Sequence, residues 1–106
     1  MTRITTGRAA DDILKGKTVL VADDTAVTRM LVADTLGSSG VRILEADCGA
    51  RALELAGENL VDAFLLDIRM PDMNGIELCR AIRGIERYEG APIMFITAMD
   101  QRDVLQ

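Results

Sequence analysis

The sequence contains no histidine and only two cysteines, Cys48 and Cys79. The Ser-His-Asp and Cys-His mechanisms of hydrolases are therefore excluded, because both depend on an imidazole as the general base. The two cysteines have no CxxC spacing, and there is no histidine to complete a zinc site with them. We expect both thiols to be reduced and structural, and any chemistry of the chain to rest on carboxylates.

Positive charge is also scarce, with 12 lysines and arginines against 17 aspartates and glutamates and a formal net charge of −5. This balance disfavours direct binding to nucleic acid or to an anionic membrane, since both require a basic surface. No apolar run approaches the roughly 20 residues of a membrane span, and the polar residues 1–7 lack the apolar core of a secretory signal. We expect a cytoplasmic protein without a membrane segment.

At 106 residues, of which 49% are hydrophobic, the chain has the size and composition of one compact domain. Residues 1–16 are polar and small, and they are predicted to form an N-terminal extension. The domain itself is expected to cover residues 17–106.

Short apolar runs alternate with segments of helical spacing. Residues 18–22, 63–66 and 93–96 are apolar at successive positions, as is typical of strands covered on both faces. Apolar residues at helical spacing lie between them; they include Val27, Met30 and Leu31, then Leu53, Ala56 and Leu60, then Leu78, Ala81, Ile82 and Ile85. The alternation predicts an α/β fold with a parallel sheet.

Residues 41–46 form a fourth candidate strand, in which Arg42 and Glu45 interrupt the apolar run. A strand with polar residues on a partly solvated side belongs at the edge of a sheet. With right-handed crossovers, the expected architecture is a flavodoxin-like doubly wound parallel sheet with strand order 2-1-3-4.

Acidic and hydroxyl side chains follow the apolar runs directly. Asp23 and Asp24 follow the first run, Asp67 follows the third, and Thr97 follows the last. Ligands bind beyond the carboxyl ends of the strands in such a sheet, so these side chains are expected to converge. Converging carboxylates repel each other unless a hard cation neutralises them, and Mg²⁺ suits a shallow oxygen site completed by water. Beside that ion, Asp67 is the expected nucleophile towards a phosphoryl group.

Each of these residues also has a simpler interpretation. Asp23 and Asp24 could cap the helix that follows them, which taken alone is about as probable as a metal site. Thr97 by itself is more often an ordinary strand-end hydroxyl. The metal-site interpretation therefore depends on the combination of the residues.

That combination resembles the receiver domains of response regulators, the CheY-like superfamily. The resemblance rests on Val-Leu-Val-Ala-Asp23-Asp24, on Leu-Leu-Asp67-Ile-Arg-Met-Pro-Asp-Met-Asn-Gly75 and on Ile-Thr97-Ala98, and it covers about residues 17–106. It implies that a sensor histidine kinase or a phosphotransfer protein phosphorylates Asp67. It also implies Mg²⁺ ligands at Asp23, Asp24, Asp67 and the backbone carbonyl of Arg69, with Asp23 acting largely through water. Thr97 would contact the phosphoryl group and act as a switch.

The sequence departs from the receiver pattern at its end. Receivers have a fifth strand that ends in a functional lysine followed by proline, whereas the lysines here are Lys15 and Lys17, at the start of the first strand. We therefore expect a C-terminally truncated receiver that lacks the fifth strand. Residues 93–96 would then form an exposed apolar edge, through which a homodimer could assemble.

Two other functions remain open at this stage. Without the lysine, the chain could be a pseudo-receiver, an interaction module that is not efficiently phosphorylated. A phosphatase of the haloacid-dehalogenase type would also place a nucleophilic Asp after a parallel strand. That family requires Asp-x-Asp, which Asp67-Ile68-Arg69 does not provide. The expected function is that of a phosphoacceptor without enzymatic activity beyond slow self-dephosphorylation.

Overall fold

A computed structural model describes residues 15–37 and 40–96 of the chain. Strands and helices alternate along it: β1 (Thr18–Ala22), α2 (Ala26–Gly37), β2 (Arg42–Ala46), α3 (Gly49–Glu58), β3 (Ala63–Asp67), α4 (Gly75–Arg83), the short 3-10 helix η1 (Glu86–Tyr88) and β4 (Ile93–Ile96). The α/β alternation predicted from the sequence is confirmed, and each expected strand agrees with the observed one to within one residue.

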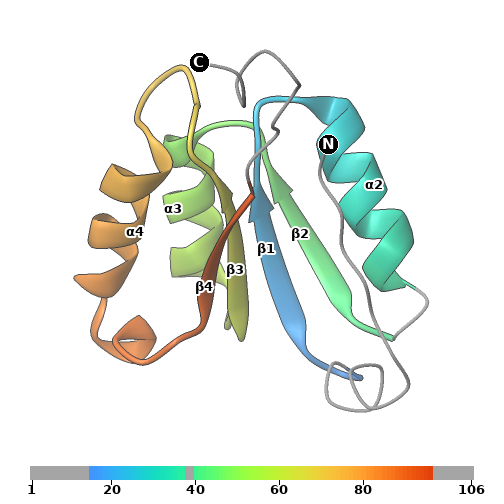
Figure 1. Ribbon diagram of the computed structural model, residues 1–106. Coiled ribbons are helices and arrows are strands. Elements are labelled where there is room, and N and C mark those ends of the chain that lie inside the picture. The colour runs from blue at the N-terminus through green and yellow to red at the C-terminus, as the bar shows by residue number, and fades with distance from the viewer. Residues whose placement is uncertain (1–14, 38–39, 97–106) are drawn as a thin grey trace.

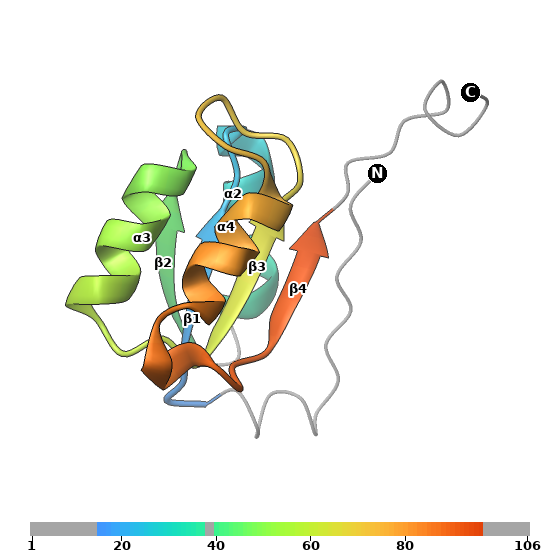
Figure 2. The same cartoon turned by 90° about the vertical axis from the view of Figure 1, so that its left-hand side faces the viewer.

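The four strands form one parallel sheet in the order β2-β1-β3-β4 (Figure 1), as predicted. Figure 2 shows their arrowheads at the same end of the sheet. In the register of the sheet, Ala22 of β1 lies opposite Ala46 of β2 and Leu66 of β3. The residues that follow Ala22 and Leu66, Asp23 and Asp67, therefore lie at the same edge of the sheet.

Helices lie on both faces of the sheet, α3 and α4 on one face and α2 on the other (Figure 1). Successive residues of the central strands enter different cores, as the alternation of side chains along a strand requires. Leu20, Phe64 and Leu66 are buried on the side of α3 and α4. Val21 and Leu65 are buried on the side of α2. Both faces of β1 and β3 are thus covered, which explains their uninterrupted apolar runs.

Helix α2 forms where expected, but the apolar stripe of Val27, Met30 and Leu31 faces solvent, with exposed fractions of 53–63%. The buried residues of α2 are Val32 and Leu36. The sequence is ambiguous here because apolar residues occur around most of the helix, so spacing alone does not identify the buried face. Leu60, expected in the second stripe, is 77% exposed and follows the end of α3. No helix within residues 15–37 and 40–96 is long and apolar enough to cross a lipid bilayer.

Strand β4 carries exposed apolar side chains, with Met94 60% and Phe95 41% accessible to solvent. In the part of the chain that the structure describes, β4 pairs with β3 on one side only. An accessible apolar edge strand is a template for pairing with another chain. Within the described part of the chain, residues 93–96 therefore form the exposed edge strand that the sequence predicts.

We predict that this edge causes the chain to self-associate, and that Met94→Lys weakens the association by placing a charge on β4. Sedimentation velocity over a range of protein concentrations measures the effect. Met30→Lys is the matched control, because Met30 is 62% exposed on α2, away from the edge. Equal association in the unmodified chain and in Met94→Lys would contradict assembly through β4.

Candidate metal centre at the carboxyl edge of the sheet

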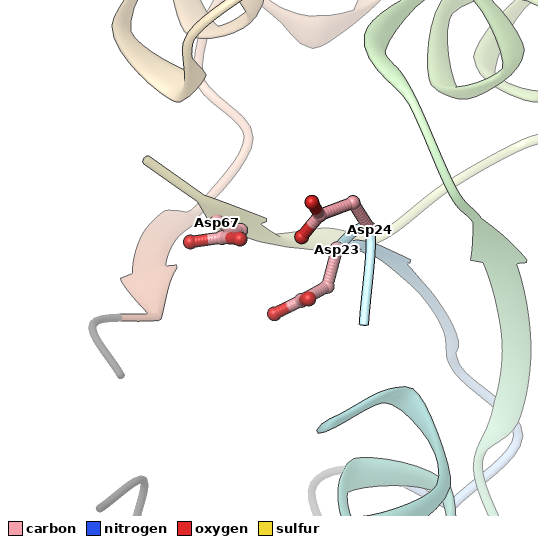
Figure 3. Close-up of side chains that lie close together, drawn as sticks. All are labelled: Asp23, Asp24 and Asp67. Carbon is pink, nitrogen blue, oxygen red and sulfur yellow. The ribbon is translucent and has the colours of Figure 1, made fainter. Parts of the chain in front are cut away.

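Three carboxylates converge beyond the ends of β1 and β3 (Figure 3). Asp23, Asp24 and Asp67 each offer an oxygen that lies within 4.8 Å of the oxygens offered by the other two. Asp23 is buried, Asp67 is half-buried and Asp24 is exposed. The cluster is therefore open to solvent on one side, and the convergence expected from the sequence is confirmed for these three acids.

The charged forms of Asp23 and Asp67 are disfavoured in the protein without a cation. Burial, followed by the negative charges of Asp67 and Asp24, raises the pKa of Asp23. Burial and the charge of Asp24 raise the pKa of Asp67. Hydrogen bonds from the amides of Thr25 and Arg69 oppose these shifts without cancelling them. A bound cation would remove the repulsion.

The donors suit a hard divalent cation such as Mg²⁺. All three side chains offer carboxylate oxygens, and the exposed side leaves room for the water ligands that Mg²⁺ retains. The amide of Thr25 donates to Asp23 Oδ1 at 2.7 Å, which leaves Asp23 Oδ2 for other contacts. The carboxylate of Asp23 therefore binds the backbone that precedes α2, and not an amide of the helix itself, while it also faces the other acids.

The predicted roles of two further site residues, Arg69 and Thr97, stay predictions. The contact recorded for Arg69 is that of its amide, which donates to Asp67 Oδ1 at 3.3 Å, so its carbonyl as a metal ligand stays a prediction. Thr97 lies outside the described residues, and its contact with a phosphoryl group stays a prediction as well.

Gly75, the first residue of α4, fixes the backbone of Asp67 by close approach. A Cβ atom at position 75 would lie 2.3 Å from the carbonyl oxygen of Asp67, a contact that the rigid backbone cannot relieve. The amide of Gly75 also donates to the carbonyl of Ile68 at 2.8 Å. Asn74 and Glu77 form a capping box at the start of α4: the amide of Glu77 donates to Asn74 Oδ1 at 2.8 Å, and the amide of Asn74 donates to Glu77 Oε1 at 3.1 Å. The start of α4 is therefore closely joined to the end of β3.

Asp72 joins the loop after β3 to the neighbouring helix α3. Its two carboxylate oxygens accept hydrogen bonds from the amides of Gly49 and Ala50, at 2.9 and 2.8 Å. These bonds lower the pKa of Asp72, the reverse of the shift at Asp67. This role of Asp72 was not predicted from the sequence. One signal was available in the sequence. Cysteine is a poor N-cap residue, and Cys48 at the N-cap of α3 makes no side-chain cap hydrogen bond, so the first amides of α3 need another acceptor.

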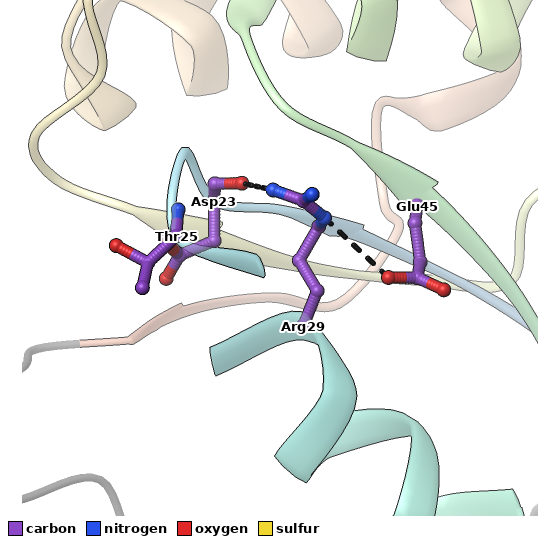
Figure 4. Close-up of polar contacts among 4 residues, drawn as sticks. All are labelled: Asp23, Thr25, Arg29 and Glu45. Carbon is purple, nitrogen blue, oxygen red and sulfur yellow. Dashed lines mark hydrogen bonds and ion pairs between the residues drawn. The ribbon is translucent and has the colours of Figure 1, made fainter. Parts of the chain in front are cut away.

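Arg29 of α2 is a second residue that the sequence analysis missed. Figure 4 shows its guanidinium between the backbone carbonyl of Asp23, to which Nη1 donates, and the carboxylate of Glu45 on β2. The distance from Arg29 Nε to Glu45 Oε1 is 3.4 Å. One side chain thus links α2, the edge strand and the residue that follows β1.

Comparisons with known proteins support the same family. The family model of the response regulator receiver domain matches residues 19–106. The chain is 35% identical over 86 residues to the chemotaxis protein CheY of Pseudomonas aeruginosa, covering 80% of this chain and 69% of that protein. It is 38% identical over 93 residues to the sensor histidine kinase RcsC of Salmonella typhimurium, covering 88% of this chain and 9% of RcsC.

A solved structure agrees with the fold. The receiver domain of the Arabidopsis thaliana histidine kinase CKI1, complexed with Mg²⁺ and BeF₃⁻, matches with a TM-score of 0.75 and 31% identity, covering 92% of this chain and 80% of that one. The regulatory protein PdtaR of Mycobacterium tuberculosis is 37% identical over 103 residues, which is 95% of this chain and 49% of PdtaR. The chain therefore spans about half of PdtaR and less than a tenth of RcsC.

We predict that Gly75→Ala destabilises the protein by about 1–3 kcal/mol, because the added methyl group overlaps the backbone of Asp67. Urea unfolding measures the change. Gly57→Ala in α3 is the matched control, since a Cβ there meets nothing within 4 Å, and it should be neutral or stabilising. Equal stability of the Gly75→Ala variant and the unmodified protein would show that the backbone yields at this point.

The raised pKa values of Asp23 and Asp67 predict how stability depends on pH. Without metal, the folded state binds protons more tightly than the unfolded chain. The free energy of unfolding therefore falls as pH rises from the usual pKa of 3.8 through the raised values, and it stays reduced above them. At pH 7 in EDTA, Asp67→Asn should raise Tm by roughly 2–4 °C, as a change of about 0.5 kcal/mol does in a domain of this size.

Thermal unfolding followed by circular dichroism tests this prediction. Asp34→Asn, which removes an exposed acid of α2 far from the cluster, is the control for net charge alone. Saturating Mg²⁺ should stabilise the unmodified protein and abolish the advantage of Asp67→Asn. A Tm of Asp67→Asn at or below that of the unmodified protein in EDTA would contradict the repulsion inferred for the cluster.

Proposed function

Since the chain belongs to the response regulator receiver domain family, we propose that it accepts a phosphoryl group on Asp67 in a Mg²⁺-dependent reaction of a two-component phosphorelay. The donor would be a sensor histidine kinase or a phosphotransfer protein. The observation that carries this proposal is the convergence of Asp23, Asp24 and Asp67 beyond two neighbouring strands. Typical members of the family are phosphoacceptors and not enzymes.

In the proposed reaction, a carboxylate oxygen of Asp67 attacks the phosphorus of the donor. A phosphorus–oxygen bond forms, the bond from phosphorus to the donor nitrogen breaks, and the donor imidazole is left to take up a proton from solvent. The product on Asp67 is an acyl phosphate. Bound Mg²⁺ would neutralise charge on the phosphoryl oxygens. Asp23 and Asp24 would hold the ion, while the Arg69 amide and the close contact of Gly75 orient Asp67.

The remaining parts of the site are proposals of the same kind. The backbone carbonyl of Arg69 is proposed as a further metal ligand, and the hydroxyl of Thr97 as the phosphoryl contact and switch. Phosphorylation would add roughly −1.5 to −2 charge units, enough to shift the position of a neighbouring loop or hydroxyl. Signalling would then proceed by conformational change.

The proposed domain organisation is an extension at residues 1–16 followed by the receiver at 17–106. The start of β1 at Thr18 and the family match from residue 19 support this boundary. A cytoplasmic location is proposed, because receivers usually work there beside their phosphoryl donors. The net charge of −5 favours protein partners over direct contact with nucleic acid or membrane lipid.

One observation favours the pseudo-receiver as a second candidate. Lys17 precedes β1 and therefore lies at the end of the sheet opposite Asp67, and the only other lysine of the chain is Lys15. The functional lysine implied by the family resemblance thus has no counterpart near the acids within the described residues. A phosphatase of the haloacid-dehalogenase type is less favoured, since Arg69 occupies the position of its second aspartate.

Phosphorylation is tested by incubating the protein with Mg²⁺ and acetyl phosphate and measuring its intact mass. The unmodified protein should gain the mass of one phosphoryl group, and the gain should disappear with EDTA. Asp67→Asn should gain none, whereas Asp34→Asn should behave as the unmodified protein. A gain that persists in Asp67→Asn would exclude Asp67 as the acceptor. No gain in the unmodified protein would favour the pseudo-receiver.

A further inference from the structure

Arg29 contacts the acidic cluster through the backbone and not through its carboxylates. Its Nη1 donates to the carbonyl oxygen of Asp23, and its Nε lies 3.4 Å from Glu45 Oε1. The side chain of Arg29 is only 18% exposed, while that of Glu45 is 47% exposed. The guanidinium therefore lies largely beneath the surface, between α2 and β2 (Figure 4).

Three separate contacts hold Asp23 in place. Its amide donates to the carbonyl of Ala46 on β2 at 3.0 Å. Its carboxylate accepts from the amide of Thr25 at 2.7 Å, and its carbonyl accepts from Arg29. The amide and carboxylate contacts involve the backbone of β2 and of the next turn. Of these three contacts, that of Arg29 is the one in which the partner of Asp23 is a side chain. The guanidinium of Arg29 also pairs with Glu45.

We propose that Arg29 is a positioning residue for the metal centre, holding Asp23 and Asp24 close to Asp67 against their mutual repulsion. This inference rests on the proposed function of the same site. The repulsion tends to move the segment after β1 away from β3, because that segment carries two of the three charges. The guanidinium opposes this movement by joining the carbonyl of Asp23 to the edge strand. Its fork of donors reaches two acceptors at once, which a lysine ammonium does less well.

Charge and positioning predict opposite effects when Arg29 is replaced. Removing a positive charge near a cation site strengthens cation binding if electrostatics alone operates. Releasing the backbone of Asp23 weakens cation binding, because the acids then have to be brought together again. The sign of the change in Mg²⁺ affinity therefore separates the two roles.

Arg51 offers a matched control for the charge. It lies on α3, pairs with Glu54 of the same helix, and lines the same surface depression as Arg29, Glu45 and Asp47. Arg51→Ala removes the same charge from this depression without removing a contact to Asp23. Its Mg²⁺ affinity should equal or slightly exceed that of the unmodified protein.

The experiment is calorimetric titration of each protein with Mg²⁺ alone, well below its Tm. We expect Arg29→Ala to bind Mg²⁺ about tenfold more weakly than the unmodified protein, as loss of a residue that orients metal ligands typically does. Arg29→Lys should lie between the two, and Glu45→Gln should also weaken binding, because it releases the anchor of Arg29. These two milder variants keep the test informative if Arg29→Ala folds poorly.

A spectroscopic measurement separates positioning from a general loss of stability. In a nitrogen-15 NMR spectrum of the metal-free protein, the amide of Thr25, which donates to Asp23, should shift in Arg29→Ala and Arg29→Lys but not in Arg51→Ala. Unchanged or tighter Mg²⁺ binding in Arg29→Ala and Arg29→Lys would overturn the positioning role of Arg29 but would leave the proposed function of the metal centre in place. If the unmodified protein binds no Mg²⁺, the proposed function of the metal centre is overturned and the role of Arg29 falls with it.

Discussion

The mutual repulsion of three carboxylates at one edge of the sheet is the constraint on which the other features of the site depend. The register of β1 against β3 brings Asp23 and Asp67 level, and Asp24 adds a third charge within 4.8 Å. Burial strengthens the effect, because water no longer screens Asp23 fully. This arrangement is unfavourable by itself and would become favourable with a divalent cation bound, which agrees with an Asp cluster typical of the receiver Mg²⁺ site.

Two of the contacts that support the cluster act on its backbone, while the amides of Thr25 and Arg69 each donate to one oxygen of a carboxylate and leave the other oxygen free of that bond. Arg29 binds the carbonyl of Asp23, and Gly75 packs against the carbonyl of Asp67. Asp72 holds the loop after β3 through the first two amides of α3. A cation directly paired with the acids would have neutralised them but would also have competed with a metal. Backbone contacts supply rigidity without that competition.

Much of the architecture could be predicted because it depends on local patterns. Continuous apolar runs identified β1 and β3, and Arg42 and Glu45 identified the edge strand. The buried face of α2 could not be predicted, since Val27 and Val32 are equally apolar. The contacts of Asp72 and Arg29 were also missed, because Asp72 lies 23 residues from Gly49 and Arg29 lies 16 from Glu45. Such pairs meet only after the sheet has assembled. The metal ligand at Arg69 and the role of Thr97 stay predictions.

The loop between β3 and α4 is held at two points. Asp72, in its middle, is hydrogen-bonded to α3, and Gly75, at its end, packs closely against the backbone of β3. A ligand that binds to such a loop meets a chain whose conformational entropy was already lost when the protein folded. Association should then proceed with a small change in chain disorder, so that its temperature dependence mainly reflects dehydration of the ion and the acids.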